Sequence, residues 1–170
     1  DEVVTSSEDG KFEREESKFR DTVNYEHKTY TPEKNRYHLY VSYACPWAHR
    51  ALITRKLKKL DDLIYFSVVH PDMLDHSWTF NKDFEGSTGD TLYGKDYLYQ
   101  IYQKSDPKAS CKVTVPILWD KKTETVVNNE SSEIIRILNS SFNDMSDGTT
   151  LDLYPKELQA EINKINKLTY

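Results

Sequence analysis

The fold is decided between residues 36 and 50, which read RYHLYVSYACPWAHR. Apolar side chains alternate with more polar ones over residues 37–43, and this two-residue period is typical of a strand. Pro46 then favours the first turn of a helix, where the N–H that proline lacks would have no partner in the helix. The stretch therefore predicts a strand that turns directly into a helix, with Cys45 at the turn.

The residues that follow extend this pattern into a strand–helix–strand unit. Apolar residues recur at helical spacing over 47–60, and the β-branched and aromatic stretch 63–69 predicts a second strand. A βαβ unit of this kind has parallel strands and a right-handed crossover. Residues 70–93 show no sustained period and predict an irregular insertion. The elements predicted beyond it are a short helix at 97–102, strands at 113–119 and 125–127, and a helix that starts at Asn128 or Asn129 and runs to Phe142.

Patterning also divides the chain into parts. The polar N-terminal part is expected to form an extended arm that its aromatic side chains hold in place, with a disordered tail as the alternative. Those side chains are Phe12, Phe19, Tyr25 and Tyr30. The predicted parts are the arm at 1–36, an α/β domain at 37–142 with the order β-α-β, insertion, β-β-α, a linker at 143–150, and the start of an amphipathic helix at 151–170.

Composition argues against several classes of protein. With 37% hydrophobic and 12% aromatic residues, the chain can bury a core, so wholesale disorder is not expected. A formal net charge of −5 without a basic block argues against binding of nucleic acid or of an anionic membrane, and no apolar run approaches the ~20 residues of a transmembrane helix. The 2 cysteines and 5 scattered histidines lack the spacing of a disulfide scaffold or a metal site, so we expect no metal and a reducing, cytoplasmic location.

Cys45 is the strongest candidate for chemistry. A thiol at the start of a helix faces unpaired backbone N–H groups and the positive end of the helix dipole, which favour the thiolate. Arg50, one turn later, adds positive charge. The alternative is an inert buried cysteine. Since the segment CPWA lacks the second cysteine of a C-x-x-C motif, a redox-active Cys45 requires an external thiol.

Further candidates lie in the second half of the chain and in the insertion. A cis Val115–Pro116 bond would leave the Val115 N–H and C=O free to pair with a peptide ligand. Glu130 and Ser131 begin a helix, where they could hold an ammonium and a carboxylate, or could simply cap it. Trp78 either walls a pocket or anchors the insertion. Cys111 is interpreted as buried or incidental.

Several stretches, read together with residues 36–50, resemble the motifs of one family. They are VTVPILWD at 113–120, VNNESSEIIR at 127–136 and DLYP at 152–155, and Phe19-Arg20 in the arm also fits. Over nearly its whole length the chain resembles the glutathionyl-hydroquinone reductases, which are also called Xi-class glutathione transferases and were grouped earlier with omega-like transferases.

The resemblance implies a fold, a co-substrate and a set of site residues. It implies a thioredoxin-like N-terminal domain followed by an all-helical glutathione-transferase domain, of which 151–170 would be the first helix, and a homodimer of the complete protein. Cys45 would be catalytic and glutathione the co-substrate, with no metal. The residues implied to bind glutathione are Trp78, Lys112, Val115, Glu130 and Ser131.

The implied roles of these residues differ. Val115 would pair with the cysteinyl backbone of glutathione, and Glu130 and Ser131 would hold its γ-glutamyl end. Lys112 stands where the family usually has Arg, so a bidentate contact to the glycyl carboxylate is not expected. Ser77 stands where Gly commonly precedes the Trp.

The function implied is reduction of S-glutathionyl-hydroquinones through a mixed disulfide between Cys45 and glutathione. Its ligands would be glutathione and small aromatic glutathione conjugates. Two alternatives remain open. One is a broader omega-like thioltransferase or dehydroascorbate reductase that uses the same cysteine. The other is a non-enzymatic interaction module with a glutathione-transferase-like fold, which the intact motif around Cys45 argues against.

Overall fold

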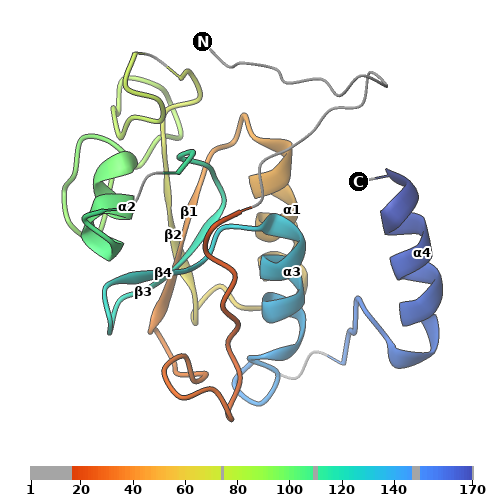
Figure 1. Cartoon of the computed structure of the whole chain (residues 1–170). Coiled ribbons are helices and arrows are strands. Elements are labelled where there is room, and N and C mark those ends of the chain that lie inside the picture. The colour runs from red at the N-terminus through yellow and green to blue at the C-terminus, as the bar shows by residue number, and fades with distance from the viewer. Residues whose placement is uncertain (1–16, 74, 109–110, 147–149, 170) are drawn as a thin grey trace.

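A mixed sheet with the strand order β2-β1-β3-β4 forms the centre of the molecule (Figure 1). The computed structural model describes residues 17–73, 75–108, 111–146 and 150–169. The strands are β1 (Tyr37–Val41), β2 (Tyr65–Val68), β3 (Ile117–Asp120) and β4 (Thr125–Asn128). Strands β1 and β2 are parallel, whereas β1–β3 and β3–β4 are antiparallel. The predicted βαβ unit and the β-hairpin after it are therefore confirmed.

Helices cover both faces of this sheet. Helices α1 (Pro46–Leu57) and α3 (Ser131–Ser140) pack against each other on one side, and α2 (Tyr99–Ser105) lies on the other (Figure 1). A short 3-10 helix, η1 (Lys156–Leu158), leads into α4 (Gln159–Thr169). None of the helices within the described ranges has both the length and the apolar character that crossing a bilayer requires.

Among the predicted boundaries that differ from the structure, three are explained by proline or capping. The strand predicted from residue 113 begins only at Ile117, because Pro116 has no N–H to give to the ladder. The helix predicted to start at Asn128 or Asn129 begins at Ser131, since Glu130 takes the N-cap position. The segment 151–155 is not helical, and Pro155 with ψ 144° holds extended backbone just before η1.

Strand β1 is more deeply buried than its alternating pattern predicted. All of its residues are buried, including the polar ones. On the polar face, His38 Nε2 lies 2.9 Å from Ser67 Oγ of the neighbouring strand β2, and the Tyr40 hydroxyl donates to Asp90 of the insertion at 3.1 Å. Burial lowers the pKa of His38 to about 4, so its ring is neutral near pH 7. This face of the sheet is therefore a polar part of the core.

The described part of the N-terminal arm is fastened to the sheet and to α3. Phe19 packs edge-on against Tyr102 with ring centroids 5.7 Å apart, and Tyr30 is buried. Arg20 forms an isolated antiparallel bridge with Asn128 at the edge strand β4. An extended arm held by aromatics is thus what the described residues show, although Tyr25 is exposed, contrary to prediction.

The arm ends in a buried ion pair. The Arg36 guanidinium donates to both carboxylate oxygens of Asp120, at 2.8 and 2.7 Å, and this joins the start of β1 to the end of β3. Phe12, the remaining predicted aromatic anchor, lies outside the described residues. The domain and linker boundaries at 37–142 and 143–150 stay a prediction.

Candidate functional site

Cys45 occupies the N-cap of α1, at the point where β1 gives way to the helix. Its backbone is extended (φ −97°, ψ 115°), and Pro46 takes the first helical position as the sequence predicted. The His49 N–H donates to the Cys45 carbonyl at 3.0 Å and closes the first turn. The thiol is partly buried against the core. The thiol thus lies at the N-terminal end of α1, where the N–H groups of the first turn have no partner within the helix.

Val115 brings a second chain segment to the thiol. The Val115–Pro116 peptide bond is cis, as predicted. The Cys45 thiol donates to the Val115 carbonyl with an Sγ···O distance of 3.6 Å. This carbonyl was expected to be free for a peptide ligand, and it is instead directed at the thiol. The structure therefore joins these two predicted site residues directly.

The start of α3 supplies the next predicted pair, Glu130 and Ser131. Glu130 is the N-cap: one carboxylate oxygen accepts from the Ser132 N–H at 3.1 Å and from the Ser132 hydroxyl at 3.0 Å. The Ser17 hydroxyl of the arm donates to the other oxygen at 3.1 Å. The capping interpretation is thus confirmed for Glu130.

Arg50 connects the two helix starts, and the sequence did not reveal this role. Sequence reasoning placed its charge next to Cys45, but its guanidinium reaches α3 and donates to the Ser131 hydroxyl oxygen from Nε at 3.1 Å and from Nη2 at 2.7 Å. Nη2 also lies 3.9 Å from a Glu130 carboxylate oxygen. On the other side, the guanidinium carbon lies 4.9 Å from the centroid of the Trp47 ring. No local pattern signals this contact, since it joins residues from two separate helices.

Trp78 and Lys112 occupy less telling positions. Trp78 is 9% exposed and packs in the core, while its carbonyl accepts from the Leu98 N–H at 2.9 Å. This matches the interpretation of Trp78 as an anchor for the insertion. Ser77 before it has φ 63°, a left-handed conformation that favours glycine. Lys112 is exposed, in the loop that leads to Val115. Contacts of Trp78 and Lys112 with glutathione stay predictions.

Cys111 differs from Cys45 in its surroundings. Burial raises the pKa of the Cys111 thiol, and the charge of Lys18 opposes this only in part. Less of it is therefore thiolate near pH 7, which agrees with the sequence interpretation of an incidental cysteine. Among residues 17–73, 75–108, 111–146 and 150–169 there is no group of three or more His, Cys, Asp or Glu side chains that could hold a metal ion.

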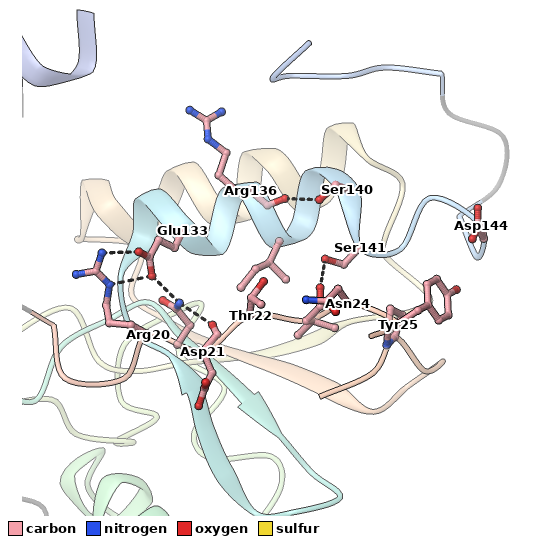
Figure 2. A pocket seen from close by; sticks show the side chains of 14 residues that line it. Arg20, Asp21, Thr22, Asn24, Tyr25, Glu133, Arg136, Ser140, Ser141 and Asp144 are labelled. Atoms are coloured by element: carbon pink, nitrogen blue, oxygen red, sulfur yellow. Dashed lines mark hydrogen bonds and ion pairs between the residues drawn. The ribbon is translucent and has the colours of Figure 1, made fainter. Parts of the chain in front are cut away.

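A cavity of about 470 Å³ lies on the other side of α3, between this helix and the arm (Figure 2). Two of its charged groups pair with each other: Arg20 binds Glu133, and the Asn128 amide donates to the same carboxylate at 2.9 Å. The Ser141 hydroxyl donates to the Val23 carbonyl at 2.6 Å (Figure 2). Neither Cys45 nor Val115 lines this cavity. The cavity therefore lies at the contact between the arm and α3 and is separate from the site around Cys45.

Comparison with known proteins gives consistent matches. Residues 44–141 match the family model described as "Glutathione S-transferase, N-terminal domain". The chain is 50% identical to the glutathionyl-hydroquinone reductase YqjG of Escherichia coli, over 98% of this chain and 52% of that protein. It is 49% identical to the glutathione S-transferase omega-like 2 of Schizosaccharomyces pombe, over 97% of this chain and 53% of that protein. The chain thus spans about half the length of these curated relatives.

Solved structures agree with the sequence matches. The glutathione-bound structure of Escherichia coli YqjG superposes with a TM-score of 0.83 at 50% identity, over 88% of this chain and 50% of that one. The glutathione-S-transferase Xi of Phanerochaete chrysosporium superposes with a TM-score of 0.90 at 46% identity, over 94% of this chain and 54% of that one. These matches confirm the predicted α/β fold of thioredoxin-like type.

Proposed function

The chain belongs to the glutathione S-transferase family, and on this premise we propose that it reduces S-glutathionyl-hydroquinones with glutathione, through Cys45. The observation that carries the proposal is the position of the Cys45 thiol at the start of α1, 3.6 Å from the carbonyl before the cis proline. The names of the relatives support it, since two proteins 50% and 46% identical to this chain are called glutathionyl-hydroquinone reductases.

The proposed reaction has two steps, and the second is a thiol–disulfide exchange. The Cys45 thiolate attacks the sulfur of the glutathionyl-hydroquinone, so an S–S bond forms and the bond between that sulfur and the ring carbon breaks. The electron pair of that bond stays on the ring carbon, which takes up a proton. A glutathione thiolate then attacks the mixed disulfide, releases oxidised glutathione and restores the Cys45 thiolate. In sum, the ring carbon is reduced, and the thioether sulfur of the substrate and the thiol sulfur of one glutathione are oxidised to a disulfide.

The binding roles follow the sequence prediction and remain part of the proposal. Val115 pairs through its backbone with the cysteinyl part of glutathione, so that the substrate sulfur lies beside Cys45. Glu130 and Ser131, at the start of α3, take the α-ammonium and α-carboxylate of the γ-glutamyl part. Lys112 offers a point charge to the glycyl carboxylate. Trp78, which is 9% exposed, contacts glutathione through its accessible part.

A second candidate is the broader activity of an omega-like thioltransferase or dehydroascorbate reductase. The name of the Schizosaccharomyces pombe relative, which is 49% identical, favours it. Both activities pass through the same mixed disulfide at Cys45, so the thiol site does not separate them. The two activities differ in the pocket for the aromatic part of the substrate. In the proposed complete protein this pocket lies largely in an all-helical domain whose first helix is α4. A cytoplasmic location and a homodimer are further parts of this proposal.

A parallel turnover assay tests the proposal. The complete protein is supplied with glutathione and either a glutathionyl-hydroquinone or dehydroascorbate, and the hydroquinone product or ascorbate is measured. We expect the catalytic efficiency to be at least about tenfold higher with the glutathionyl-hydroquinone, a difference of ~1.4 kcal/mol in transition-state binding. A preference for dehydroascorbate supports the second candidate. No turnover of either substrate, or of a glutathionyl mixed disulfide supplied in a third assay, would support the non-enzymatic module.

A further inference from the structure

The Arg50 guanidinium makes an unusual contact with Ser131, because two of its N–H groups converge on one hydroxyl oxygen, at 3.1 and 2.7 Å. The Arg50 side chain is 29% exposed, and Ser131 is 3% exposed. The indole ring of Trp47 lies 4.9 Å from the guanidinium carbon and holds its plane by a cation–π contact. The Arg50 guanidinium is thus held between Trp47 of α1 and Ser131 of α3.

This contact determines which hydrogen bonds the Ser131 hydroxyl can still make with a ligand. A serine hydroxyl has two acceptor lone pairs and one donor hydrogen. Two N–H donors from Arg50 use its acceptor side, so the O–H is directed away from the guanidinium as a donor. Hydrogen bonds from a charged donor also polarise the hydroxyl and strengthen the bond that it donates. Ser131 is therefore prepared to donate to an anion at the start of α3, where the helix dipole also favours negative charge.

The charges at the start of α3 match an amino-acid zwitterion. The Glu130 carboxylate lies next to Ser131 and 3.9 Å from Arg50 Nη2, which is the outer limit of an ion pair. In the proposed complex the α-ammonium lies beside the Glu130 carboxylate and the α-carboxylate beside the Ser131 hydroxyl. The γ-glutamyl end of glutathione carries both groups on one carbon.

We propose that Arg50 is a positioning residue, which fixes Ser131 as a hydrogen-bond donor to the α-carboxylate of the γ-glutamyl group. The inference rests on the proposed function, since it takes glutathione as the ligand. Arg50 acts through Ser131 rather than by contact with the reacting sulfur atoms. Its loss therefore weakens glutathione binding and raises KM for glutathione, while kcat at saturating glutathione changes little.

A double-mutant cycle tests whether Arg50 acts through Ser131. Glutathione is titrated by calorimetry into the complete reduced protein, as wild type, Arg50→Gln, Ser131→Ala and the double variant. We expect Arg50→Gln to raise Kd about tenfold, as when a charge-assisted hydrogen bond is weakened. In the Ser131→Ala background the same change should raise Kd less than about twofold, because the hydroxyl that it orients is gone. An equal rise in both backgrounds, or no rise in the wild type, overturns the proposal.

Conservative variants separate positioning from a general loss of stability. Arg50→Lys keeps the charge but offers no planar fork, so it should recover only part of the affinity that Arg50→Gln loses. Arg55→Lys is the matched control in the same helix, since Arg55 pairs with Asp61 at 2.9 Å. It should lower the melting temperature without changing Kd for glutathione. A Kd that follows the melting temperature across both arginines would contradict the proposal.

The same titration also tests the proposed function separately. A wild-type protein that does not bind glutathione would refute the function itself. A wild-type protein that binds glutathione as tightly as Arg50→Gln does would refute only the role of Arg50.

Discussion

The two helix starts that build the site are held in opposite ways. At α1, the N-cap Cys45 makes no side-chain capping bond, and its thiol turns to the Val115 carbonyl. At α3, the N-cap Glu130 accepts from the Ser132 N–H and from Ser17 of the arm. The N-cap side chain therefore caps its own helix at α3 but not at α1.

This difference between the helix starts matches their proposed roles: the start of α1 carries the reacting sulfur, and the start of α3 positions the ligand. At α1 the proposed nucleophile occupies the N-cap, and its sulfur makes no capping bond. The α3 start needs rigidity instead, and Asn128 just before it gives this: its amide donates to the Asp21 carbonyl and to Glu133, and its oxygen accepts from the Glu130 N–H at 2.7 Å. The arm, β4 and α3 thus share one hydrogen-bond network. The following predictions test this division, from the largest expected effect to the smallest.

Replacing the nucleophile should remove the chemistry and keep the binding. We expect Cys45→Ser to lower glutathione-dependent reduction by about 10³-fold or more, because a serine hydroxyl is not a thiolate and cannot form a mixed disulfide. Glutathione should still bind, since binding is assigned to other residues. A hydroxyl can also stabilise the glutathione thiolate, so conjugation activity can rise.

Turnover and calorimetry on the same protein check both parts of this prediction, with Cys111→Ser as the control that should keep its activity. Retained reductase turnover in Cys45→Ser would mean that another group is the nucleophile. Lost glutathione binding would mean that the thiol is a main anchor and that the two roles are not separate.

Cutting the network at α3 should cost more stability than truncating the cap of α1. We expect Asn128→Ala to lower the free energy of unfolding by about 2–3 kcal/mol, because Asn128 is 1% exposed and its buried partners lose their hydrogen bonds. Cys45→Ala should cost less than about 1 kcal/mol, since Cys45 makes no capping bond. Urea unfolding of both variants measures the difference, and equal losses would remove the contrast between the two helix starts.

The two cysteines should differ in reactivity. We expect iodoacetamide to alkylate Cys45 at least about tenfold faster than Cys111 at pH 7, because burial raises the pKa of the Cys111 thiol and reduces its thiolate fraction. The rate at Cys111 should keep rising above pH 8.5, the region of an ordinary thiol. Rates against pH in Cys45→Ala and Cys111→Ala resolve the two. Similar rates at pH 7 would show that the start of α1 does not activate its thiol.

The smallest effect concerns Ser77, outside both helix starts. With φ 63° this residue is strained by its Cβ, so Ser77→Gly should raise the free energy of unfolding by up to about 1 kcal/mol, after allowance for the greater chain entropy of glycine. Ser140→Gly at the exposed end of α3 is the control and should lower stability by a similar amount. A loss of stability in Ser77→Gly would mean that the serine side chain makes a contact worth more than the strain.

Much of the fold could be predicted because its signals are local. A two-residue period, a proline after Cys45 and a helical apolar stripe together placed β1, α1 and β2. The same reasoning placed the thiol at the start of a helix. The resemblance to the family assigned Val115 to the same site. These features depend on the backbone preferences of neighbouring residues, so a single chain segment carries the information.

Only the tertiary structure decided how the site is held. The bond between Arg50 and Ser131 and that between Ser17 and Glu130 join residues that lie 81 and 113 positions apart. Tertiary packing also buried the polar face of β1, and placed Trp78 in the core. Such contacts depend on which surfaces meet once the chain has folded, and the strand and helix periods carry no signal of the partner. Sequence therefore determined where the reactive thiol lies along the chain, and packing decided what surrounds and orients it.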